Sequence, residues 1–294
     1  MRCARTAALT LTAAALVAGT AACSGSGDDG RPAGGGSAFE AVQAAAESTA
    51  DTTSARVDAV MTMPPAAGGT VEMAGAMSWD PELAMELTMS GDAMAADPSM
   101  PEETTVVWAD DVMYMQMGEE FAAQYQGRGW LGMNLTELAE ETGNPALGDA
   151  MSMGLDEANQ DPAQQLAILL QSPEIELVGE ERLEDGTRTS HYRGTIAVDD
   201  ALENNGAADL LSEGERQELA DMMRQQGIEA YDIDVWVDGN DFPVQIHQAY
   251  DTHQGPVSYE ARYSDFGTEV SAEAPPAGEV VDIMELLSAQ GVTG

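Results

Sequence analysis

The sequence of 294 residues contains no lysine, so all 11 of its basic residues are arginines. The 52 acidic residues outnumber them and give a formal net charge of −41. A surface this acidic repels nucleic acids and anionic membranes alike, so we expect no nucleic-acid partner. Attachment to a membrane would therefore need a covalent lipid rather than a basic patch.

Long hydrophobic runs are also missing, since the apolar stretch of residues 7–18 is too short to span a bilayer. It follows Arg2 and Arg5 and leads to Thr20-Ala21-Ala22-Cys23, small residues that end in cysteine. This layout is typical of a bacterial lipoprotein signal. We expect residues 1–22 to be a signal peptide. The alternative is an ordinary secretory signal with an incidental cysteine.

Cysteine occurs only at Cys3 and Cys23, so cleavage would leave Cys23 without a disulfide partner and free to carry a lipid. Removal of residues 1–22 would leave 272 residues, 9 of them basic, and a net charge of −43. Residues 23–36 predict a lipidated cysteine followed by a flexible Gly/Ser/Asp tether, with a span of roughly 20 Å. Residues 37–290 remain for one folded domain.

The sequence has few of the residues from which catalytic sites are built. Its histidines are His191, His247 and His253, and no Gly-x-Ser-x-Gly motif occurs. His191 is expected to pack on a strand. We therefore predict a protein that is not an enzyme and uses no cofactor.

Two patterns invite a metal interpretation, and both have simpler explanations. Met113, Met115 and Met117 alternate along one strand, where successive thioethers lie about 6.5 to 7 Å apart, too far to share Cu(I) easily. Four aspartates alternate along a strand and turn instead of forming a continuous calcium loop: Asp232, Asp234, Asp238 and Asp241. We expect no metal site.

Most of the chain alternates between apolar and polar residues, the pattern of strands with one buried face. This alternation predicts ten strands, at residues 57–63, 71–79, 83–89, 104–109, 112–117, 174–184, 187–198, 231–237, 244–250 and 257–263. Helices are predicted at residues 37–49, 134–143, 161–170, 212–223 and 279–289. Their signals include capping residues such as Ser37, Asn134 and Asp161, the last of which is followed by proline. The fold class is thus α+β, with one antiparallel sheet and helices on one side.

The order of these parts resembles the LppX/LprG-type lipoproteins of actinobacteria, which are related in shape to the LolA and LolB carriers. The resemblance covers about residues 39–287. The resemblance rests on Cys23 and on a helix followed by a meander of strands. It also rests on three groups of motifs: residues 112–115 with Gly129-Trp130, residues 178–194, and residues 235–238 before a hairpin.

The resemblance implies a half-open β-barrel, a single curved sheet whose concave face is covered by helices. It also implies an apolar cavity that holds lipid or glycolipid acyl chains. Methionine fits such a cavity because it is unbranched and adapts to irregular shapes. Eleven of the 18 methionines lie between Met61 and Met117. The expected lining residues are Met61, Met63, Val71, Met73, Met77, Leu83, Met85, Leu87, Met89, Met113, Met115 and Met117.

The helices between the two groups of strands are expected to act as a lid over this cavity, through Leu135, Leu138, Leu166, Leu169 and Leu170. The predicted function is that of a lipoprotein anchored through Cys23 on the extracytoplasmic face of the membrane, which binds and transports or displays envelope lipids. The alternative is a structural or signalling lipoprotein whose half-barrel is filled by its own side chains. Such a protein would bind an envelope protein or wall polymer instead.

Overall fold

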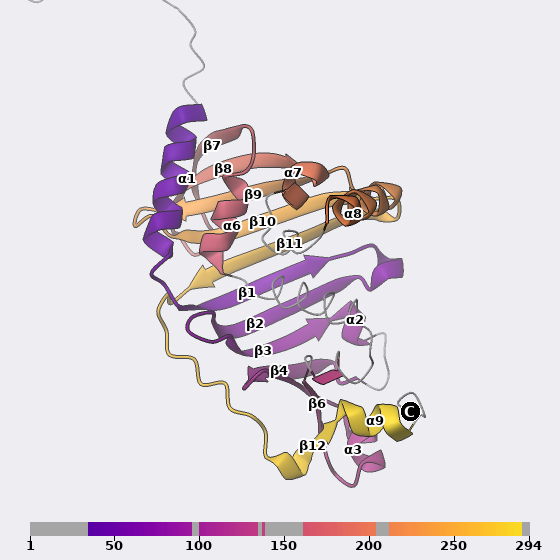
Figure 1. Ribbon diagram of the computed structural model, residues 1–294. Helices are drawn as coiled ribbons and strands as arrows, with labels where there is room; N and C mark the ends of the chain where they lie inside the picture. Colours follow the sequence, from indigo (N-terminus) through magenta and orange to yellow (C-terminus); the bar gives the residue numbers. More distant parts are fainter. Residues whose placement is uncertain (1–34, 96–99, 135–136, 139–160, 204–211, 290–294) are drawn as a thin grey trace, which may run out of the picture. The chain divides into compact units, whose positions relative to one another are not determined.

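The computed structural model describes residues 35–95, 100–134, 137–138, 161–203 and 212–289 (Figure 1). All of them belong to one compact unit, Ala33–Gly294. Cys23 and Leu135 lie outside the described residues. Within the part of the chain that is described, every helix is too short or too polar to cross a membrane.

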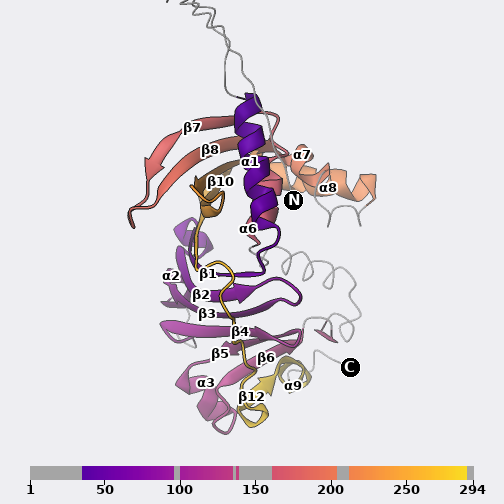
Figure 2. The same cartoon turned by 90° about the vertical axis from the view of Figure 1, so that its left-hand side faces the viewer.

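A single 12-stranded sheet forms the framework, in the order β12-β6-β5-β4-β3-β2-β1-β11-β10-β9-β8-β7. The sheet is curved and does not close on itself (Figures 1 and 2). Its strands are β1 (Ser54–Thr62), β2 (Thr70–Ser78), β3 (Ala84–Gly91), β4 (Glu103–Ala109), β5 (Val112–Gln116), β6 (Trp130–Asn134), β7 (Ile175–Arg182), β8 (Arg188–Ala197), β9 (Ala230–Asp238), β10 (Pro243–Thr252), β11 (Gly255–Ser264) and β12 (Val280–Asp282). The α+β class and the curved open sheet are therefore confirmed.

The number of strands and the purely antiparallel pairing are corrected. Ten strands match the alternating segments, and the structure adds β6 and β12 at one edge. These two strands pair in parallel, with Val281 opposite Leu131. The sheet is therefore mixed. Strand β6 also lies between residues 117 and 174, where the sequence predicts helices and no strand.

The helices are α1 (Gly35–Thr49), α2 (Asp92–Ala95), α3 (Glu119–Gln124), α6 (Pro162–Leu169), α7 (Val198–Glu203), α8 (Glu213–Gln225) and α9 (Ile283–Ala289). Helix α1 begins at Gly35, so the predicted start at Ser37 is two residues too late. The prediction for residues 279–289 is also corrected, because β12 precedes α9 there. The short helices α2, α3 and α7 were not predicted.

Capping by polar side chains was predicted correctly at two other positions. The side chain of Asp161 accepts a hydrogen bond from the backbone N–H of Ala163 at 2.8 Å, and Pro162 follows at the first helical position. Asn134 Oδ1 accepts from the backbone N–H of Glu137 at 3.0 Å. Such bonds satisfy donors that the first turn of a helix leaves free. The remainder of the helix predicted at 134–143 lies outside the described residues.

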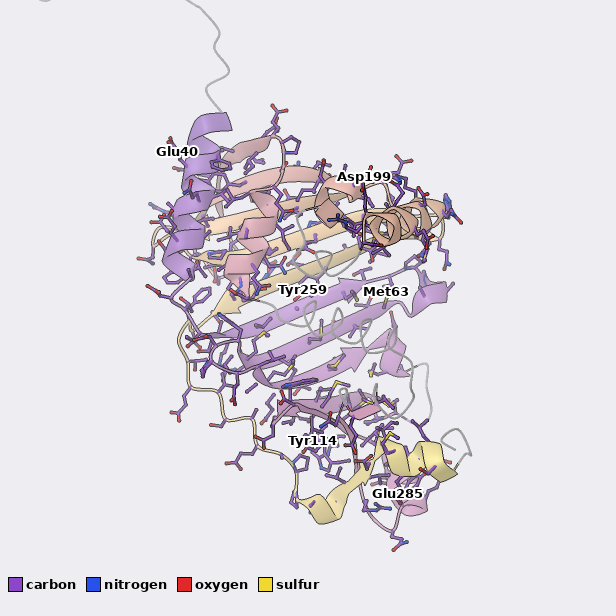
Figure 3. The ribbon with its side chains drawn as sticks, in the orientation of Figure 1. Glu40, Met63, Tyr114, Asp199, Tyr259 and Glu285 are labelled. Atoms are coloured by element: carbon purple, nitrogen blue, oxygen red, sulfur yellow. The ribbon has the colours of Figure 1, made fainter. Side chains whose placement is uncertain are left out.

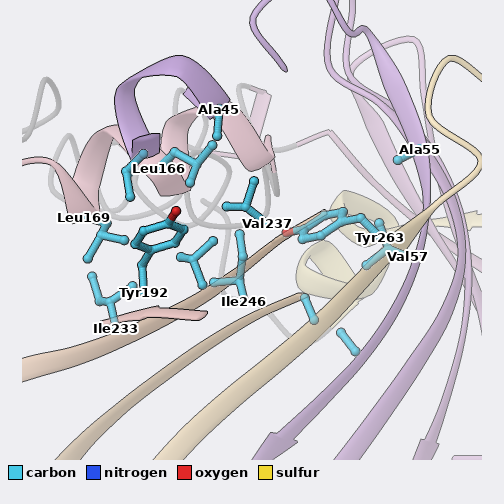
Figure 4. Packing of buried hydrophobic residues seen from close by; sticks show 14 of the residues in the cluster. Ala45, Ala55, Val57, Leu166, Leu169, Tyr192, Ile233, Val237, Ile246 and Tyr263 are labelled. Atoms are coloured by element: carbon cyan, nitrogen blue, oxygen red, sulfur yellow. The ribbon is translucent and has the colours of Figure 1, made fainter. Parts of the chain in front are cut away.

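The hydrophobic core forms where α1 and α6 lie over the concave face of strands β7 to β10 (Figures 1 and 2). Val42 of α1 and Leu166 and Leu169 of α6 are fully buried in one cluster with Ile233, Val235 and Ile246 of the sheet. Figure 4 shows Leu166 and Leu169 close to Ile233 and Ile246. Helices α7 and α8 enclose a second, smaller cluster around Val198 and Ala220. The helices thus cover one half of the sheet.

The pairing register fixes which residues share a face of the sheet. Val57 of β1 lies opposite Gly75 of β2 and Tyr263 of β11, and side chains alternate between faces from these positions. We call the face that carries Val57 and the buried core the inner face, and the opposite one the outer face.

The C-terminal segment is held to the rest by an arginine. Arg128 donates from both terminal guanidinium nitrogens to the two carboxylate oxygens of Glu285 on α9, each at 2.7 Å. This paired geometry orients both groups more strictly than a single bond would. The hydrogen bonds raise the pKa of Arg128 and lower that of Glu285.

Replacing Leu166 by alanine is expected to lower the free energy of unfolding by about 2 to 5 kcal/mol, because its fully buried side chain would leave a cavity. Denaturant titration followed by circular dichroism measures the loss. Gln164→Ala on the exposed face of the same helix is the control and should change stability by less than about 0.5 kcal/mol. Equal effects of the two substitutions would contradict the assignment of the core.

Arg128→Gln should release β12 and α9 while leaving the remaining strands folded, because it removes the bonds to Glu285. Hydrogen exchange followed by mass spectrometry should show faster exchange in peptides that cover residues 280–289 and unchanged exchange in α1. Arg216→Gln on α8 is the control. Unchanged exchange at residues 280–289 in the Arg128 variant would show that β12 pairing alone holds the segment.

Candidate functional site

The predicted lining residues within the strands fall on one face of the sheet. We define the methionine face as the inner face of strands β1 to β5. It carries Met61, Val71, Met73, Met77, Met85, Leu87, Met89, Met113 and Met115. Four of the five strands, β1, β2, β3 and β5, contribute these residues, and the register places them on the same face.

Direct cross-strand pairs bring the thioethers together. Met73 lies opposite Met89, and Met77 lies opposite Met85. On the neighbouring strands, Met113 lies opposite Met133 of β6. Side chains in such pairs are about 4.5 to 5.5 Å apart at their Cβ atoms, which is within contact distance for methionine. The result is two groups of thioethers, one on β2 and β3 and one on β5 and β6, separated by Val106 and Trp108 of β4.

Burial divides this face into two zones. Met77 and Met85, 1% and 7% exposed, belong to the packed core together with Trp108. Met61, Met73, Met89, Met113 and Met115 are only half-buried. The packed zone contributes to stability, whereas the half-buried zone leaves part of each apolar side chain exposed to solvent.

Three predicted lining residues lie just outside the strands. Met63 follows the end of β1 at the turn into β2 (Figure 3), and its backbone N–H donates to the carbonyl of Gly69. Met117 follows β5 in the same way and bonds to Gly129. Leu83 immediately precedes β3 and packs against the core. All three border the methionine face.

The predicted lid residues have different surroundings. Leu166 and Leu169 are fully buried in the core under α1, and Leu170 packs against that core. Leu138 is also buried. Since Leu166 and Leu169 fasten α6 to strands β7 to β10, these two side chains anchor the helix and are not displayed to a ligand.

Sequence reasoning missed a polar cluster on the outer face. The ring nitrogens of His191 contact Asp234 Oδ1 at 2.6 Å and Glu181 Oε1 at 3.0 Å, while the ring stacks on Trp236. Arg193 donates to Asp234 Oδ1 at 2.7 Å. His191 lies on β8 as expected, but the paired carboxylates come from β7 and β9, which the local sequence could not reveal.

The outer face also contains a pocket of about 400 Å³. It is lined mainly by outer-face residues of β1, β2, β3 and β11, among them Asp58, Glu72, Thr88, Glu260 and Arg262. Most of its lining residues are polar or charged, and it lies on the side of the sheet opposite the methionine face. The described residues bring together no group of three His, Cys, Asp or Glu side chains that could hold a metal ion.

Two Streptomyces proteins are similar to this chain over most of its length. A Streptomyces coelicolor protein that is provisionally named a lipoprotein, SCO4650, is 30% identical over 225 residues, which cover 75% of this chain and 67% of the relative. An uncharacterized 31.2 kDa protein of Streptomyces griseus is 31% identical over 235 residues, covering 76% of this chain and 72% of the relative.

The chain belongs to this Streptomyces lipoprotein family. No protein-family model matches the sequence. Among solved structures, lipoprotein LppX of Mycobacterium tuberculosis has 14% identity and a TM-score of 0.46, covering 81% of this chain and 98% of LppX. LprF of Mycobacterium bovis has 16% identity and a TM-score of 0.47, covering 82% of this chain and 98% of LprF.

The outer-face cluster predicts a pH dependence of stability. Hydrogen bonds from Trp236 and His191 hold the pKa of Glu181 below its ordinary value of 4.5. A carboxyl group whose pKa is depressed on folding stabilises the protein above that value and loses this effect as the pH falls through the folded-state pKa. Glu181→Gln should therefore lower the thermal midpoint near pH 7, and the difference from wild type should shrink as the pH falls below about 4.5.

Differential scanning fluorimetry from pH 7 to pH 3 measures this difference. Glu180→Gln, one residue away on the same strand, is the matched control and should leave the profile unchanged. A constant difference between wild type and Glu181→Gln at all pH values would contradict the proposed role of the carboxylate.

Proposed function

We propose that the protein is a lipoprotein on the extracytoplasmic face of the membrane, anchored through acylated Cys23, which binds the acyl chains of an envelope lipid on its methionine face. Its work is capture and release without chemistry. The observation that carries this proposal is the group of half-buried methionines that share the inner face of strands β1, β2, β3 and β5. Membership of the Streptomyces lipoprotein family supports the anchored location.

The chemistry of methionine suits this task. A compact core is usually specified by Leu, Ile and Val, and these residues do fill the half of the sheet under α1 and α6. Methionine is concentrated instead where the inner face is half-buried. Its flexible side chain can follow the changing outline of an alkyl chain. Burial of apolar surface contributes about 0.8 kcal/mol per methylene, so one long chain would bind tightly.

The acidic surface of the protein is consistent with attachment to the membrane through a covalent lipid. A net charge of −41 opposes adsorption to an anionic bilayer. An acyl group on Cys23 would keep the domain near its lipid source without requiring a basic surface. The flexible segment after Cys23 would let the domain move relative to the membrane.

A second candidate rests on the packed zone of the methionine face. Met77 and Met85 already fill space beside Trp108, as they would in a half-barrel closed by its own side chains. In that case the protein would be a structural or signalling lipoprotein that binds a protein or wall polymer of the envelope.

The proposal is tested by placing a charge on the half-buried zone. Met73→Asp should abolish uptake of a fluorescent fatty acyl lipid, because the carboxylate would have to be desolvated against the bound chain. Ala74→Asp adds the same charge at the next position of β2, on the exposed outer face, and should leave uptake at the wild-type level.

Thermal unfolding shows whether each variant remains folded. Wild-type uptake by folded Met73→Asp would overturn the proposed site. Absence of lipid uptake in the wild-type protein would favour the filled half-barrel.

A further inference from the structure

The inner face carries a buried hydroxyl group without a partner. Tyr263 of β11 is 3% exposed, and its hydroxyl makes no hydrogen bond within the described structure. Figure 4 shows its ring within the cluster of buried apolar side chains. Folded proteins rarely leave a buried hydroxyl without a hydrogen-bond partner, so the unpaired hydroxyl of Tyr263 suggests a partner that is not part of the protein.

A second tyrosine lies on the same strand and the same face. Tyr259 pairs with Met61 of β1 on one side and with Gln248 of β10 on the other (Figure 3). Gln248 in turn donates a hydrogen bond to the side chain of Gln165 on α6. The two phenols therefore lie beside the methionine face, at its border with the helix-covered half.

The surroundings of these tyrosines favour uncharged groups. Desolvation raises the pKa of both phenols well above the ordinary value of 10, so both remain neutral donors. The carboxylate of Asp161, at the start of α6, lies close enough to raise the pKa of Tyr263 further. The nearby formal charge is thus negative.

On β11 and the two strands that adjoin it, β1 and β10, arginines occur only at outer-face positions. Arg56, Arg193 and Arg262 occupy outer-face positions of β1, β8 and β11, where each pairs with a carboxylate. A phosphate brought to Tyr259 and Tyr263 would meet Asp161 without a compensating cation. Burying such an unpaired anion is strongly unfavourable.

We propose that Tyr259 and Tyr263 form a polar subsite that donates hydrogen bonds to an uncharged oxygen of the bound lipid, an ester carbonyl or a hydroxyl. This subsite deepens the proposed function and rests on it. Tyr259 and Met61 are direct cross-strand neighbours, so a chain that leaves the subsite enters the methionine face at once. From β1 to β5 the face extends about 19 Å, which accommodates a long extended acyl chain.

The test compares the full-length protein with a double variant, Tyr259→Phe and Tyr263→Phe, which keeps both rings and removes both hydroxyls. Tyr114→Phe is the matched control because Tyr114 lies on the outer face of β5. Three probes are offered in phosphatidylcholine vesicles: dioleoylglycerol, dioleoyl phosphatidic acid and hexadecane. They share apolar chains but carry a neutral, an anionic and no polar group.

The wild-type protein should bind dioleoylglycerol more tightly than phosphatidic acid. The double variant should lose about three- to tenfold in affinity for dioleoylglycerol, the effect of a lost hydrogen bond, with its affinity for hexadecane unchanged. Its thermal midpoint without ligand should not fall, because the Tyr263 hydroxyl has no partner to lose. Tyr114→Phe should match the wild type throughout.

Equal affinity of the double variant and wild type for dioleoylglycerol would overturn the subsite, while continued hexadecane binding would leave the proposed function intact. Equal wild-type affinity for phosphatidic acid and dioleoylglycerol would overturn the preference for an uncharged group. Failure of the wild-type protein to bind any of the three probes would overturn the proposed function and the subsite together.

Discussion

The structure depends on the register of the central strands. Val57 pairs with Gly75 on one side and Tyr263 on the other, and every apolar row of the inner face follows from these pairs. Because side chains alternate along a strand, a slip of one residue would turn Met73 and Met77 to the outer face. The methionine face and the core under α6 would be lost together.

Glycine at position 75 makes that register possible. A Cβ atom there would come within 2.1 Å of the carbonyl oxygen of Glu86 on β3. No side chain fits such an approach of two strands, so the close pairing of β2 with β3 requires Gly75. The same close pairing sets Met73 opposite Met89 and Met77 opposite Met85.

Local sequence patterns were sufficient where strands alternate over many residues and pair with their neighbours in the chain. Strands β1 to β5 and β7 to β11 were predicted for this reason. Strand β6 has five residues with Gly132 in the middle, and β12 has three residues whose partner lies about 150 positions away. Their pairing depends on contacts distant in sequence, such as Arg128 with Glu285, which no local pattern contains.

The candidate site, like the fold, was predictable from the sequence only in part. Alternation predicts that the methionines share a face, but it does not separate the packed Met77 and Met85 from the half-buried Met73 and Met89. That difference arises from which neighbours cover each side chain. The unpaired hydroxyl of Tyr263 is likewise a property of the assembled core, because Tyr263 belongs to a buried cluster whose members come from both halves of the chain.

Native mass spectrometry with organic extraction tests most directly whether the methionine face holds acyl chains. The protein would be purified from membranes of a Streptomyces host and analysed before and after incubation with host lipids. The account predicts a bound lipid near one per protein, in addition to the covalent anchor. A protein mass without bound lipid under both conditions would contradict it and direct the search to protein partners.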